Sequence, residues 1–73
     1  MENDKNKADR FIRIAERRTN TILETLRLLG NCSNTNNYKY TEQQVKKIFN
    51  AIEQEVKNTK IKFDKKDEKF SLK

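Results

Sequence analysis

Apolar residues recur at helical spacing in two stretches of the chain, and a polar tract separates them. This spacing predicts a first helix over about residues 5–29. At about 100° per residue, Ile12 and Leu23 widen its apolar face on one side. The centre of that face is formed by Phe11, Ala15, Ile22, Leu26 and Leu29.

The first predicted helix stops at a glycine. Gly30 suits the left-handed position that commonly comes after the last turn of a helix. The tract 31–37 consists of Asn, Ser, Thr and Cys and shows no periodicity. Because Asn and Ser side chains bond to nearby backbone groups, they compete with helix formation. We therefore predict a loop over residues 30–41.

The second predicted helix has a clear N-terminal signal. Thr41 and Gln44 stand at the spacing of a capping box, in which each side chain bonds to the other residue's backbone N–H. The helix is predicted to run over about residues 42–59. Its buried stripe is predicted to consist of Val45, Ile48, Phe49, Ile52 and Val56.

Residues 60–73 fit three different structures. Ile61 and Phe63 alternate with lysines, so a small β-hairpin could pair Phe63 with Phe70. The second helix could instead continue, because Phe63 remains on its apolar stripe. A charged, disordered tail over 61–73 is the third possibility.

These elements predict an all-α fold in which residues 1–60 form an antiparallel two-helix hairpin. A chain of 73 residues buries little apolar surface, and its single Cys and lack of His exclude an internal disulfide and the usual zinc sites. We therefore expect a homodimer, most simply a four-helix bundle, in place of a covalent or metal staple. The apolar positions that one partner helix leaves uncovered are Ile12, Ile14, Leu23 and Leu28.

The net charge of +6 is concentrated towards the ends of the chain. On the first helix, spacings of three and four predict an Arg face, defined as Arg10, Arg13, Arg17 and Arg27, opposite the apolar side. Several guanidinium groups on one helical edge can reach neighbouring phosphates. A solvated face balanced by Glu16 and Glu24 is the alternative interpretation. In the Lys-rich tail, Lys62, Lys65 and Lys66 are further candidates for phosphate contacts.

The sequence offers no catalytic site, cofactor motif or metal-ligand cluster. Cys32 has no His beside which it could act as a nucleophile, because the chain contains none. No apolar N-terminal segment comes after Met1, and no run of apolar residues reaches the length of a membrane span. We expect a cytoplasmic protein that is not an enzyme and does not bind membranes.

One resemblance adds to this interpretation. Over about residues 5–60, the chain resembles small uncharacterised helical-hairpin proteins associated with plasmids and integrative elements of low-GC Gram-positive bacteria. The resemblance implies an accessory or regulatory protein of a mobile element and assigns no functional residues. It is carried by Lys7-Ala-Asp-Arg-Phe11, Ala15-Glu-Arg-Arg-Thr-Asn20, Leu26-Arg-Leu-Leu-Gly-Asn-Cys-Ser-Asn34, Tyr38-Lys-Tyr-Thr41 and Val45-Lys-Lys-Ile-Phe49.

Two functions are compatible with the sequence. The first is a nucleic-acid-associated accessory protein that binds phosphates of DNA or RNA through the Arg face and the Lys-rich tail. The second is a protein-interaction module, an adaptor or an inhibitor, that acts through exposed apolar positions such as Ile14 and Leu28.

Overall fold

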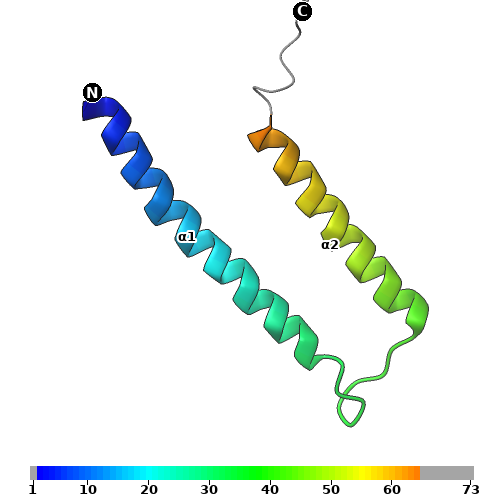
Figure 1. The fold of residues 1–73 in the computed structure, drawn as a ribbon. Coiled ribbons are helices and arrows are strands. Elements are labelled where there is room, and N and C mark those ends of the chain that lie inside the picture. The colour runs from blue at the N-terminus through cyan, green and yellow to red at the C-terminus, as the bar shows by residue number, and fades with distance from the viewer. Residues whose placement is uncertain (1, 65–73) are drawn as a thin grey trace, which may run out of the picture. The chain divides into compact units, whose positions relative to one another are not determined.

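The computed structural model describes residues 2–64 of the chain, and the side chains of residues 4–64. Two α-helices, α1 (Glu2–Asn31) and α2 (Glu42–Phe63), are the regular elements of this part, which contains no strand (Figure 1). The chain divides into two units, residues 1–39 with α1 and residues 40–73 with α2. The all-α class predicted from the periodicity is confirmed.

Helix α1 has 30 residues and is longer than predicted at both ends. Gly30 does not end it: no glycine in the described residues has a positive φ, and the helix continues to Asn31. The predicted left-handed cap is therefore wrong. The N–H groups of Cys32 and Ser33 donate to the carbonyls of Leu29 and Gly30 at 2.9 and 3.0 Å, so these orphan carbonyls are satisfied by a tight final turn.

The loop after α1 is organised by Asn34. Its backbone carbonyl accepts hydrogen bonds from the N–H groups of Asn37 and Tyr38, at 3.1 and 3.0 Å. Its side-chain oxygen also accepts from the N–H of Asn36, two residues on, at 2.9 Å. This local bonding is typical of Asn in turns. The loop that the polar composition predicted is thus an ordered series of turns.

Helix α2 begins with the predicted capping box. The Gln44 N–H donates to the Thr41 hydroxyl at 3.1 Å, and the Thr41 N–H donates to the Gln44 side-chain oxygen at 2.8 Å. Thr41 has the extended backbone conformation of an N-cap, with φ −111° and ψ 161°. Two of the orphan N–H donors at this helix end are therefore satisfied within the chain.

Helix α2 ends later than predicted, at Phe63. Asp64 caps it, and its N–H donates to the carbonyls of Lys60 and Ile61 at 3.2 and 3.1 Å. Of the three alternatives for residues 60–73, the β-hairpin through Ile61 and Phe63 is excluded, because both residues are helical. The continued-helix alternative therefore holds for residues 60–63, whereas the alternatives for residues 65–73 lie outside the described residues.

No residue among those with described side chains is buried. The stripe of α2 was predicted to be buried, yet Ile48, Phe49 and Val56 retain 41–53% of their exposure. A short chain has too little apolar surface to remove these side chains from water. The side chains with intermediate burial are Ile14, Ala15, Leu29, Val45 and Ile52.

Candidate nucleic-acid interface

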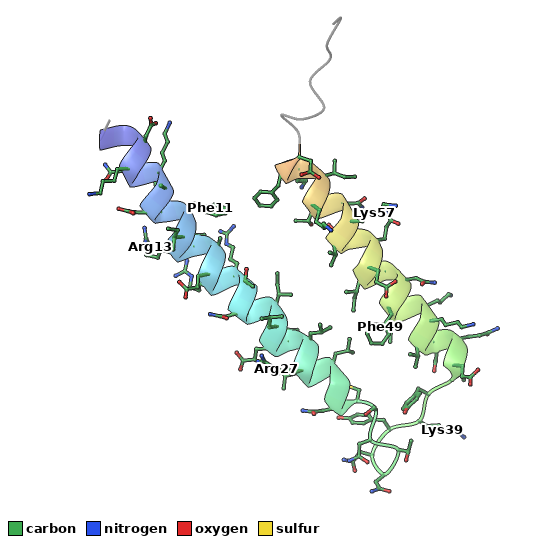
Figure 2. The ribbon with its side chains drawn as sticks, in the orientation of Figure 1. Phe11, Arg13, Arg27, Lys39, Phe49 and Lys57 are labelled. Carbon is green, nitrogen blue, oxygen red and sulfur yellow. The ribbon has the colours of Figure 1, made fainter. Side chains whose placement is uncertain are left out.

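The Arg face lies on one side of α1. Arg10, Arg13 and Arg17 succeed one another at intervals of three and four residues, and Arg27 continues the same side further along the helix. All four side chains are exposed. In Figure 2, Arg13 and Arg27 project from the side of α1 opposite Phe11. The face predicted from the sequence therefore exists as a surface of a single element.

An open depression lies in the middle of this face. The Thr21 hydroxyl at its edge donates to the Arg17 carbonyl at 3.1 Å, so it is bonded to its own helix. The guanidinium groups of Arg13 and Arg17 and the amide of Asn20 are the donors left to contact a ligand. The depression is lined by Arg13, Glu16, Arg17, Asn20, Thr21 and Glu24.

Two carboxylates share the depression with the two guanidinium groups. Glu16 and Glu24 balance Arg13 and Arg17 in formal charge, so Arg10 and Arg27, beyond the lining, supply the excess positive charge of the Arg face. Among the described residues, neither glutamate forms an ion pair of 4.0 Å or less with these arginines. The guanidinium groups are therefore available to an external anion, although the nearby carboxylates reduce the positive potential.

The predicted tail lysines are only partly described. Lys62 is exposed in the last turn of α2 and belongs to the unit of α2, whereas the Arg face belongs to the unit of α1. Lys65 and Lys66 lie outside the described residues. Among the described residues, the predicted phosphate contacts that lie together on one surface are therefore those of the Arg face.

Three of the four predicted interface residues are strongly exposed. Ile12 retains 60% of its exposure, Leu23 43% and Leu28 59%. Ile14 is of intermediate burial and offers less accessible apolar surface than its place in the pattern predicted.

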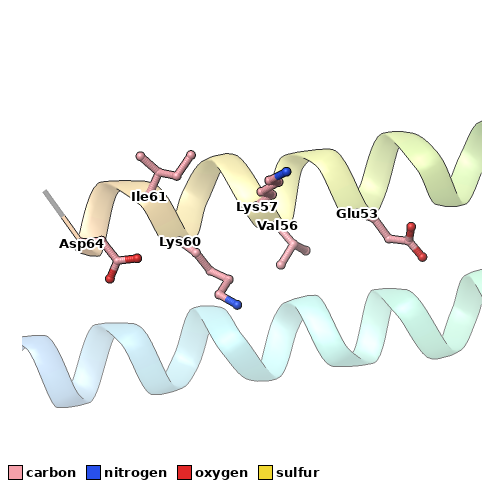
Figure 3. Close-up of a pocket in the computed structure, with 6 residues that line it drawn as sticks. All are labelled: Glu53, Val56, Lys57, Lys60, Ile61 and Asp64. Carbon is pink, nitrogen blue, oxygen red and sulfur yellow. The ribbon is translucent and has the colours of Figure 1, made fainter. Parts of the chain in front are cut away.

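A second open depression, on the C-terminal half of α2, was not predicted (Figure 3). The sequence feature that could have predicted it is the i,i+4 spacing of Glu53 with Lys57 and of Lys60 with Asp64, which places each pair on one side of a helix. The second helix was predicted to end at about residue 59, so Lys60 and Asp64 were not expected to be next to each other on a helix. It is lined by Glu53, Val56, Lys57, Lys60, Ile61 and Asp64.

Cys32 is exposed as a free thiol, and no group of three or more potential metal ligands occurs among the described residues. Neither described helix combines the length and apolar character needed to cross a membrane. The side chains of the Arg face can bind and orient an anion.

Comparisons with known proteins identify no protein that is related to this chain. The chain matches no family model, and no curated protein or solved structure is significantly similar to it. The resemblance to mobile-element proteins thus stays a prediction, and the function has to be inferred from the residues themselves.

Proposed function

We propose that this protein is a non-enzymatic accessory or regulatory factor, of the kind found on mobile elements, that binds nucleic-acid phosphates through the Arg face of α1. The observation that carries the proposal is the position of four exposed arginines on the side of α1 opposite its apolar face. An Arg fork matches the geometry of a phosphate and can hold it through two parallel hydrogen bonds.

The Arg face is a better functional candidate than the apolar faces because of what folding requires. In an antiparallel hairpin or a four-helix bundle, exposed apolar side chains such as Phe11 and Ile22 would form the core. The arginines on the opposite side of α1 remain on the surface in any such assembly. In a dimer, two copies of the face would double the number of phosphate contacts.

The test is binding of a labelled generic duplex and a labelled single strand, measured by fluorescence anisotropy at two salt concentrations. We expect affinity that falls steeply with salt, because each phosphate contact releases counterions. The variant R13Q/R17Q should bind several-fold more weakly, with a salt slope smaller by about 1–2. Its helicity should equal that of the wild type, since both side chains are exposed.

A matched control separates the Arg face from net charge. The variant K46Q/K47Q also removes two positive charges, from exposed positions in the first turns of α2. It should retain most of the affinity. Equal losses in the two variants, or no binding by the wild type at low salt, would overturn the proposal.

A second function, a protein-interaction module, is favoured by Leu28. This side chain is 59% exposed and lies on the side of α1 that carries Arg10, because a separation of eighteen residues makes five helical turns. An apolar residue beside arginines resembles the centre of a protein interface. This module is the function to pursue if the anisotropy experiment shows no binding.

A further inference from the structure

Two polar side chains that are not arginines lie at the centre of the Arg face. At about 100° per residue, Asn20 and Glu24 each lie within about 20° of Arg13 around the axis of α1. Both are exposed, and both line the depression on this helix. Arg13 and Arg17 come before them along α1 and Arg27 comes after them, so the two side chains have arginines on either side.

Neither side chain has a partner among the described residues. The Asn20 amide makes no hydrogen bond to another described residue, and Glu24 makes neither a hydrogen bond nor an ion pair with one. Thr21, which lies next to Asn20, is instead bonded to the Arg17 carbonyl. The amide of Asn20 therefore keeps two N–H donors and an acceptor, and the carboxylate of Glu24 keeps two acceptor oxygens.

Glu24 is unfavourable on a surface that binds phosphates alone, because its carboxylate repels a phosphate. It is favourable where base edges are within reach. A carboxylate accepts a hydrogen bond from the N4 amino group of cytosine, and an Asn amide bonds to both N7 and N6 of adenine. These groups are accessible in the major groove of B-DNA, which admits one α-helix, whereas the major groove of duplex RNA is too narrow.

We propose that the centre of the Arg face contacts base edges in the major groove of duplex DNA, with Asn20 on an adenine and Glu24 on a cytosine. This inference rests on the proposed nucleic-acid function and names the substrate of the same surface. Arg10 and Arg27 lie on opposite edges of the face and about 25 Å apart along α1, so they can reach the two backbones that border the groove. From Asn20 to Glu24 the helix rises about 6 Å, or roughly two base-pair steps.

The first test uses a pool of DNA duplexes in which a short central stretch is randomised, and the bound fraction is sequenced. We expect enrichment of an adenine and a cytosine about two steps apart, with affinity at least about tenfold above that for a scrambled duplex. Salt-dependent binding of every duplex without enrichment would overturn the base contacts and leave the proposed function standing. No binding to any duplex or single strand would overturn both. A single strand that binds more tightly than the enriched duplex would overturn the groove arrangement alone.

Two variants of α1 assign the bases to the side chains. Asn20→Ala should remove the preference for adenine and keep the helix, because alanine is the better helix former. Glu24→Gln should remove the preference for cytosine yet tighten binding to the scrambled duplex, because one repulsion disappears. The control Glu53→Gln removes the same charge from an exposed position on α2 and should keep both preferences. If Glu24→Gln tightens binding to both duplexes equally, Glu24 contacts no base and the inference fails.

The second test changes the DNA and leaves the protein unmutated. A 7-deazaadenine at the enriched adenine replaces the N7 acceptor in the major groove by carbon and keeps the Watson–Crick edge. One of the two hydrogen bonds from Asn20 is then lost, so affinity should fall by about 2- to 10-fold. The same DNA should make no difference to Asn20→Ala. No loss in the wild type, or an equal loss in the two proteins, would overturn the contact between Asn20 and adenine.

Discussion

At the scale of single residues, Gly30 shows how the end of a helix depends on the residues that come after it. A glycine before a polar tract usually adopts the left-handed cap conformation. Here the N–H groups of Cys32, Ser33 and Asn34 satisfy the carbonyls of Leu29, Gly30 and Asn31, and Gly30 stays helical. Its backbone therefore lies where any L-residue fits, and its conformational freedom serves no visible purpose in the folded state.

This makes Gly30→Ala a stabilising substitution. A methyl group added at Gly30 meets nothing within 4 Å, and φ there is not positive. Alanine should raise the free energy of unfolding by about 0.5–1 kcal/mol, because it reduces the conformational entropy of the unfolded chain. Urea unfolding monitored by circular dichroism measures the change. A destabilised variant would show that Gly30 does take up the left-handed conformation in solution.

At the scale of elements, the start of α2 depends on the reciprocal bonds of Thr41 and Gln44. Thr41→Ala removes the hydroxyl that accepts from the Gln44 N–H and should cost about 1 kcal/mol. Thr41→Ser keeps an acceptor at the same place and should lose only a fraction of that. Thermal unfolding of the two variants makes the comparison. If Ala and Ser prove equal, the cap does not contribute to stability.

The sequence predicted those features that depend on residues close together in the chain. The capping box was predictable because Thr41 and Gln44 are three positions apart, and each side chain bonds to the backbone N–H of the other residue. The end of α2 was not, because alternation of Ile61 and Phe63 with lysines fits a strand as well as a helix. Burial was predicted wrongly for Phe49 and Val56, since burial depends on partners that a stripe does not specify.

The Arg face was predictable for the same local reason. Helical periodicity alone places Arg13 and Arg17 together once α1 is recognised. Periodicity does not predict whether Glu16 forms an ion pair with these arginines. The structure shows that it forms none. The depression on α2 was missed because it needs the additional turn that contains Lys60 and Asp64.

At the scale of the whole molecule, stability should depend on chain concentration. No described side chain is buried, and most helical stability in proteins comes from packing of an amphipathic face. Each large apolar side chain that becomes fully buried contributes about 1.5–3 kcal/mol. Phe11, Ile22 and Phe63 retain 57–65% of their exposure. Association that buries such side chains would therefore stabilise the folded chain.

We expect the melting temperature to rise with protein concentration, because folding coupled to association obeys mass action. For a dimer of this size, a tenfold increase should raise the melting temperature by roughly 4–5 °C. Circular dichroism melts over a hundredfold concentration range measure the dependence, with Leu28→Glu as a variant that should keep it and Leu26→Glu as one that should weaken it. A melting temperature that stays constant over this range would mean that one chain folds alone, and that the exposed apolar faces serve another partner.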